Sequence, residues 1–117
     1  MLNNTQKGQS AEDLAEQFLV KKGMRIISRN FHFGKTGEID LIAQDGATLV
    51  FVEVKARWND NFGAPEESIS YSKAQKLRRA AEGYMYVNKI QNRDCRFDFI
   101  GIEYKGEPVI NHIVNAF

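Results

Sequence analysis

The stretch GEIDLIAQDGATLVFVEVKAR, from Gly37 to Arg57, decides the fold of this chain. Two apolar runs, Glu38–Ala43 and Thr48–Arg57, flank the dipeptide Asp45-Gly46, a pattern typical of a tight β-hairpin. The run Leu49-Val50-Phe51-Val52 is apolar on both faces, which predicts an interior strand covered on both sides. The centre of the chain therefore predicts a hairpin inside a layered fold.

The polar residues of this hairpin fall on one face. Side chains alternate between the two faces of a strand, so Glu53 and Lys55 point the same way. A two-residue loop at Asp45-Gly46 would pair Asp40 with Phe51. This register predicts that Asp40 shares a face with Glu53 and Lys55 and is a diagonal neighbour of Glu53. A loop longer by one residue would move Asp40 to the opposite face.

Two carboxylates and a lysine on one face are the parts of a metal-dependent phosphodiesterase. Carboxylate oxygens bind hard divalent cations such as Mg²⁺ or Mn²⁺, and we expect Asp40 and Glu53 to hold the metal. Lys55 beside it would orient or deprotonate a water, or stabilise developing negative charge. Glu38, opposite Glu53 in this register, is an extra ligand or an outer partner. The alternative is an ordinary ion pair between Glu53 and Lys55, although charges flanking so apolar a strand need a reason.

Periodicity places the other elements around the hairpin. Helices are predicted over Ser10–Lys22, with Ser10 as the N-cap, and from a capping box at Ser72 and Gln75 to about Asn88. Further strands are expected over Arg25–Phe33, Arg96–Tyr104 and Val109–Val114, and Trp58–Tyr71 indicates a loop. This order predicts an α/β (α+β) fold, with a mixed central β-sheet flanked by helices.

Composition limits what the chain can be. With 117 residues, 43% of them hydrophobic, we expect a single domain over residues 1–117. A net charge of +1 leaves any nucleic-acid surface to local clustering. The single cysteine, Cys95, excludes a disulfide within the chain. No segment approaches the ~20 apolar residues that span a bilayer, so we expect a cytoplasmic protein without a membrane partner.

The hairpin also carries a family likeness. The stretch GEID…FVEVK resembles the D-x(n)-E-x-K signature of the restriction-endonuclease-like superfamily, and more narrowly the YraN-type family of bacterial endonucleases, which is similar to archaeal Holliday-junction resolvases. The likeness extends to Arg29-Asn30, to the second helix and to Arg96-Phe97-Asp98. It implies a restriction-endonuclease-like core in which Asp40 and Glu53 are the metal-binding carboxylates and Lys55 is the catalytic lysine.

The resemblance also implies an acidic residue on the first helix. Glu12 matches that position, and the helical step of about 100° per residue sets it beside Leu19 at the rim of the apolar face. Glu16, one turn further on, is the alternative. A solvated helix edge explains either residue equally well.

Basic residues near the hairpin are candidates for contact with a phosphate backbone. They are Lys73, Lys76 and Arg79 on the second helix and Arg57 at the end of the hairpin strand. Lys73 and Lys76 lie on one flank of the apolar face, from which they would reach a neighbouring active site. A solvated basic face is at least as good an explanation. Asp98 is interpreted as a structural charge partner, for instance of an arginine on the second helix.

Together these features predict a Mg²⁺-dependent endonuclease that hydrolyses phosphodiester bonds in DNA, with branched or structured DNA included and RNA less favoured. Resolvase-like relatives act as dimers, so the resemblance implies a homodimer with two-fold symmetry. The alternatives are a non-catalytic nucleic-acid-binding module and an interaction protein, each of which would retain the nuclease fold.

Overall fold

The computed structural model describes residues 4–35, 37–58 and 70–117, with side chains from Ser10 onward. Its elements are α1 (Asn4–Lys21), β1 (Arg25–His32), β2 (Glu38–Asp45), β3 (Thr48–Arg57), α2 (Tyr71–Val87), β4 (Cys95–Lys105) and β5 (Glu107–Ile113). The predicted loop Trp58–Tyr71 falls mostly on residues 59–69, outside the described residues. Strand β3 has the predicted bounds, and the ends of the other strands lie within two residues of the prediction. Within the described ranges, no helix combines the length and apolarity that crossing a bilayer requires.

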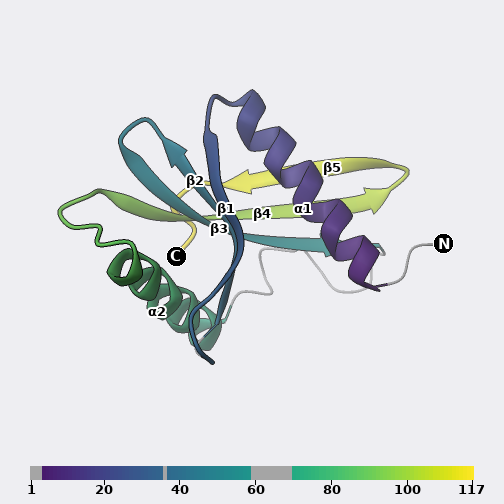
Figure 1. Cartoon of the computed structure of the whole chain (residues 1–117). Coiled ribbons are helices and arrows are strands. Elements are labelled where there is room, and N and C mark those ends of the chain that lie inside the picture. The colour runs from purple at the N-terminus through teal and green to yellow at the C-terminus, as the bar shows by residue number, and fades with distance from the viewer. Residues whose placement is uncertain (1–3, 36, 59–69) are drawn as a thin grey trace.

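The strands form one sheet in the order β1-β2-β3-β4-β5. The β3–β4 pair is parallel and the other neighbours are antiparallel. Figure 1 shows α1 lying across one face of the sheet and α2 packing against the other. The predicted fold, a mixed sheet flanked by helices, is confirmed, and it is compatible with a nuclease-like core.

Strand β3 takes part in both hydrophobic cores. Val50 and Val52 pack in the core under α1, and Leu49 and Phe51 pack in the core under α2. All four side chains are at most 2% exposed. The predicted interior strand, covered on both faces, is therefore confirmed.

Both helices begin earlier than the sequence pattern predicts. Helix α1 begins at Asn4, so Ser10 lies inside it and is not its N-cap. The N-cap of α2 is Ser70, whose Oγ accepts a hydrogen bond from the Lys73 N–H at 3.1 Å, so the capping box predicted at Ser72 is wrong. Polar opening turns carry no apolar periodicity, and two nearby serines offer alternative caps.

The hairpin turn lies one residue later than predicted. Asp45 pairs with Thr48, so the two loop residues are Gly46 and Ala47. Gly46 has a φ of 60°, a left-handed conformation that glycine adopts at little cost. Gln44 therefore pairs with Leu49, whereas the predicted loop at Asp45-Gly46 would have paired it with Ala47.

This turn changes the register of the hairpin without changing its faces. Phe51 pairs with Ile42, so the predicted pairing of Phe51 with Asp40 is also wrong. The register has moved by two residues, and a shift of two leaves the side chains from Leu41 to Val52, where the ladder is regular, on the predicted faces. Continuing the ladder by one pair sets Asp40 directly opposite Glu53, closer than the predicted diagonal.

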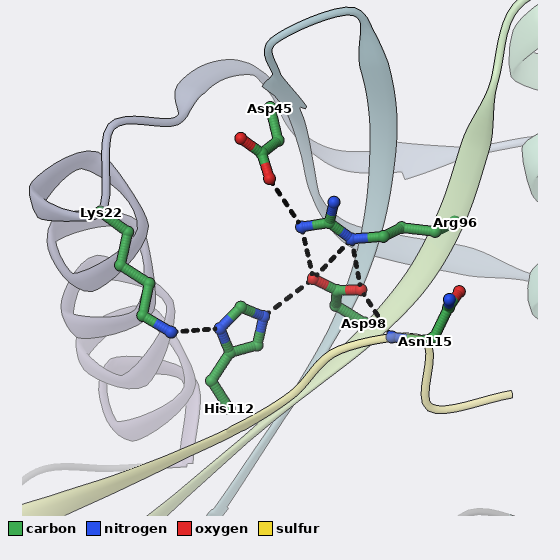
Figure 2. A network of polar contacts seen from close by, with 6 residues as sticks. All are labelled: Lys22, Asp45, Arg96, Asp98, His112 and Asn115. Atoms are coloured by element: carbon green, nitrogen blue, oxygen red, sulfur yellow. Dashed lines mark hydrogen bonds and ion pairs between the residues drawn. The ribbon is translucent and has the colours of Figure 1, made fainter.

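A buried polar cluster joins α1 to the last two strands (Figure 2). Asp98 is fully buried on β4, and it accepts hydrogen bonds from Arg96 Nε at 3.0 Å and from the Asn115 N–H at 3.1 Å. His112 Nε2 lies 2.8 Å from Asp98 Oδ2, and Lys22 Nζ lies 3.0 Å from the other ring nitrogen. The suggested arginine partner on α2 is wrong, because Asp98 pairs with Arg96 of its own strand and with His112 of β5.

Gly83 allows α2 to pack closely on the chain that leaves β1. A Cβ atom at this position would overlap the ring of Phe33. We expect Gly83→Ala to lower the free energy of unfolding by about 1–3 kcal/mol, because overpacking outweighs the helix preference of alanine. Urea denaturation measures this change, and Glu82→Ala, on the exposed side of the same turn, is the control. An unchanged midpoint for Gly83→Ala would contradict the close packing.

Candidate functional site

In β1 and in β2, side chains two residues apart lie on opposite faces of the sheet, and this change of face occurs at paired positions of the two strands. Arg29 bonds to acidic side chains of α1, whereas Phe31 packs in the core under α2. Residues two apart in a strand normally share a face. Their partners on β2 behave alike, since Leu41 lies in the core under α1 and Ile39 in the core under α2.

Asn30 is the residue at which β1 changes face. Its φ is 54°, a left-handed conformation that asparagine tolerates better than most side chains. The register of β1 and β2 sets Asn30 opposite Asp40. Asp40 therefore lies at the crossover, where side chains from both faces of the sheet can approach it.

Three carboxylates converge at this crossover. One oxygen from each of Glu12, Glu38 and Asp40 lies within 4.8 Å of the other two. Glu12 comes from α1, and the other two residues come from β2. The β2–β3 register sets Asp40 opposite Glu53, so the predicted position of Glu38 opposite Glu53 is wrong. Carboxylates are nevertheless drawn together from two elements that are distant in the sequence.

Arg29 holds the acidic edge of α1. Its guanidinium nitrogens lie 2.7 Å from Asp13, 3.4 Å from Glu12 and 3.8 Å from Glu16. Of the two alternatives on this helix, Glu12 belongs to the cluster with Asp40, whereas Glu16 is not part of it and lies 3.8 Å from Arg29 Nη1. Arg29 thus positions Glu12 and offsets part of its charge.

The carboxyl group of Asp40 is costly to ionise. Its burial, followed by the nearby charge of Glu53, raises its pKa from 3.8 to about 8. The Val54 N–H donates a hydrogen bond of 2.8 Å to Asp40 Oδ2, which acts in the opposite direction, and the charges of Glu12 and Glu38 raise the pKa further. A cation bound among these oxygens would relieve this cost.

The cluster opens onto a cavity of about 440 Å³ between the β2–β3 hairpin and the first turn of α2. We call it the metal cavity, after the cation that the sequence predicts there. Glu53 is only 6% exposed, and its Oε1 lies 2.6 Å from Lys73 Nζ. The predicted site residues that line this cavity are Asp40, Glu53, Lys55, Lys73 and Lys76. Glu12 is not among the lining residues and reaches Asp40 from α1.

Two predicted nucleic-acid contacts lie outside the metal cavity. Arg57 is half-buried at the end of β3, next to Glu103 in the parallel ladder. Arg79 is exposed on α2, three residues beyond Lys76. Neither residue lines the cavity, so the structure does not bring them to Asp40 and Glu53.

Gly37 and Ser70 shape the cavity wall, and neither was among the site residues predicted from the sequence. Gly37 has a φ of 154°, and a Cβ atom there would lie 3.2 Å from the carbonyl oxygen of Lys76. This glycine therefore allows β2 to pass close to α2. Its only signal in the sequence was its place in a glycine-containing turn, and Ser70 was hidden by the competing cap at Ser72.

The three clustered donors suit a hard divalent cation. All of them are carboxylates, and such oxygen ligands are what Mg²⁺ and Mn²⁺ prefer. Asp40 is held at a raised pKa among them, so the residues present fit a bound cation electrostatically as well as chemically.

Comparison with known proteins assigns the family. Residues 11–102 match the profile of a family described as Uncharacterised protein family UPF0102. The chain belongs to the UPF0102 family. The matched segment of this UPF0102 protein contains Glu12, the whole β2–β3 hairpin and the lysines of α2.

Individual UPF0102 relatives match nearly the full length of the chain. A UPF0102 protein of Carboxydothermus hydrogenoformans is 43% identical over 116 residues, which cover 98% of each chain. A UPF0102 protein of Clostridioides difficile is also 43% identical over 116 residues, covering 99% of this chain and 100% of its own. These names give a family and no activity, so the YraN-type nuclease assignment remains a prediction.

Proposed function

We propose that this UPF0102 protein is a divalent-metal-dependent endonuclease that hydrolyses phosphodiester bonds in DNA, including branched or structured DNA. The convergence of Glu12, Glu38 and Asp40 within 4.8 Å carries this proposal. Three carboxylates at such separations repel one another unless a proton or a cation intervenes. Their position beside a cavity lined by lysines favours a cation together with a phosphate.

Asp40 would hold Mg²⁺ or Mn²⁺ together with the neighbouring carboxylates of Glu12, Glu38 and Glu53. When bound, such a cation neutralises charge on a phosphate and lowers the pKa of a water molecule. Arg29 would keep Glu12 in place during this chemistry through their 3.4 Å ion pair.

The lysines give the opposite side of the cavity a positive charge. Lys55 is exposed and follows Glu53 on the same face of β3, so its ammonium group can bind a phosphate oxygen or orient the attacking water. Lys73 and Lys76 extend the positive charge along α2. The first turn of α2 lines the same cavity, and the N-terminus of a helix favours anions.

Cleavage of defined DNA substrates tests the proposal. Labelled linear duplex, single-stranded, flap and four-way-junction DNA are incubated with Mg²⁺, Mn²⁺ or EDTA. We expect cleavage to require metal and to be lost in Lys55→Met. The control Glu16→Gln should still cleave, because Glu16 contacts Arg29 without belonging to the carboxylate cluster. Failure to cut any of the four substrates in either metal would contradict the proposal.

One observation favours a second candidate function, nucleic-acid binding without cleavage. Lys73 Nζ lies 2.6 Å from Glu53 Oε1. This ion pair engages a carboxylate oxygen with which Glu53 would otherwise bind a metal. A chain in which this pair stays closed would bind a phosphate backbone through its lysines and leave it intact. A gel-shift assay on the same DNA substrates that shows binding in EDTA, together with no cleavage in either metal, would support this candidate.

A further inference from the structure

A second cavity adjoins the metal cavity across the opening turn of α2. It has a volume of about 340 Å³ and shares Ser70 with the metal cavity. Ser72 and Lys73 line the metal cavity, whereas Tyr71 and Ala74 line the second one. The turn thus separates a cavity lined by charged residues from one lined mainly by aromatic and apolar residues.

The second cavity is lined by flat and apolar groups. Phe99, Ile113 and Phe117 lie beneath it, and the last residues of the described chain run beside α2 (Figure 1). The Ala116 N–H donates a hydrogen bond of 2.7 Å to the Phe97 carbonyl oxygen, which fixes this part of the lining to β4. The lining is therefore held by the sheet.

Two side chains at the rim are suited to stacking. Tyr71 is 80% exposed, and Arg78 is exposed about two turns further along the same side of α2. Aromatic rings and arginine guanidinium planes are the groups on which proteins stack unpaired nucleobases. Among the described residues that line the cavity, none has an acidic side chain, so these residues do not oppose a polyanion.

We propose that this second cavity, which we call the base pocket, binds an unpaired nucleobase of the strand whose phosphate lies in the metal cavity. The base pocket is defined by Ser70, Tyr71, Ala74, Arg78, Phe99 and Phe117. The inference rests on the proposed function, because it takes the metal cavity as the phosphate site. One nucleotide carries a base and a phosphate on the same sugar, so it needs two adjoining sites of these two chemistries.

The base pocket narrows the class of substrate. A base inside a duplex is stacked on both faces and must leave the helix before a protein pocket can take it up. The volume of about 340 Å³ lies at the small end for ligand sites and suits a single base. The preferred substrates are therefore single strands, flaps or junctions that already present an unpaired nucleotide.

Fluorescence anisotropy with labelled oligonucleotides tests the base pocket. The probes are an oligothymidylate strand, an abasic strand of equal length and a duplex, each in Ca²⁺ with a gel to confirm that the strand stays intact. We expect Tyr71→Ala to weaken binding of the oligothymidylate about tenfold, as the loss of one stacked base does, and to leave the other two probes unchanged. Tyr86→Ala is the matched control, because Tyr86 is 82% exposed at the other end of α2.

The outcomes separate the base pocket from the nuclease proposal. If Tyr71→Ala binds each of the three probes with the affinity of the wild type while DNA is still cleaved, the proposed base pocket is wrong and the proposed nuclease activity stands. Base-dependent binding with no cleavage in any metal supports the base pocket and removes the nuclease. If Tyr71→Ala or Arg78→Ala changes the mass measured by light scattering and leaves DNA affinity unchanged, the pocket is an interface between copies and the proposal is overturned.

Discussion

Asp40→Asn is expected to abolish metal-dependent cleavage and, at the same time, to stabilise the metal-free protein. The amide keeps the size of the carboxylate and can still accept the hydrogen bond from the Val54 N–H. It removes the charge that a divalent cation requires, so we expect cleavage to fall by more than about a hundredfold, beyond the effect usual for an outer partner of a metal ligand.

The stability gain follows from the raised pKa of Asp40. The folded protein keeps a proton on Asp40 up to about pH 8, whereas the unfolded chain releases it near the ordinary aspartate pKa of 3.8. Folding therefore binds a proton in this window, and the stability of the wild type falls as the pH rises through it. Asp40→Asn escapes this loss, so its advantage grows from about pH 4 to about pH 8 and then levels off, reaching roughly 1–3 kcal/mol.

Urea denaturation in EDTA at pH 5 and pH 8 measures the gain. We expect the unfolding midpoint of Asp40→Asn to exceed that of wild type, by more at pH 8 than at pH 5. The exposed Asp13→Asn, on the other side of Arg29, is a control for loss of an acidic group without burial. An Asp40→Asn protein less stable than wild type at pH 8 would show that the carboxylates do not repel in the metal-free fold.

Asp98→Asn is expected to lower the free energy of unfolding by about 3 kcal/mol at neutral pH. Asp98 is fully buried and pairs with Arg96, and its loss leaves Arg96 with only the more exposed Asp45, at 3.1 Å, as a charged partner. The variant also places an amide N–H₂ where the Asn115 N–H and His112 Nε2 now meet a carboxylate. The buried polar cluster around Asp98, which links β5 to the end of α1 and which we call the clamp, is therefore weakened (Figure 2).

The pH dependence of this effect has the opposite sign to that of Asp40. Burial raises the pKa of Asp98, but hydrogen bonds from His112, Arg96 and the Asn115 N–H outweigh burial and leave the pKa below 3.8. Asp98 thus contributes stability that is present above about pH 4 and is lost as the pH falls through its lowered pKa. The difference between wild type and Asp98→Asn should shrink in acid. The exposed Asp94→Asn is the control, and an equal effect of both variants would contradict the clamp.

Much of the fold and of the metal cavity could be predicted from the sequence because the signals are local. The Asp-Gly turn and the apolar run before Glu53 are short-range features, and the period of two put Glu53 and Lys55 on one face even though the turn was placed one residue early. The resemblance supplied Glu12, whose position on α1 has no local signature that separates it from Glu16.

The remaining features depend on tertiary contacts. Nothing in the sequence around Asn30 indicates its left-handed backbone conformation. Only the packing of Arg29 and Phe31 on opposite faces of the sheet reveals the crossover. The partnership of Asp98 with His112 joins residues on neighbouring strands whose register the sequence does not specify. The base pocket likewise forms between α2, β4 and the end of the described chain.

The central claim is that the carboxylates of Glu12, Glu38 and Asp40 form a divalent-cation site, and calorimetric titration with Mn²⁺ tests it most directly. Wild type should bind Mn²⁺, with affinity weakened about tenfold or more in Glu12→Gln. Glu16→Gln should bind as wild type does, because Glu16 contacts the same Arg29 and is absent from the cluster. No Mn²⁺ binding by the wild type, or equal losses in both variants, would contradict the account.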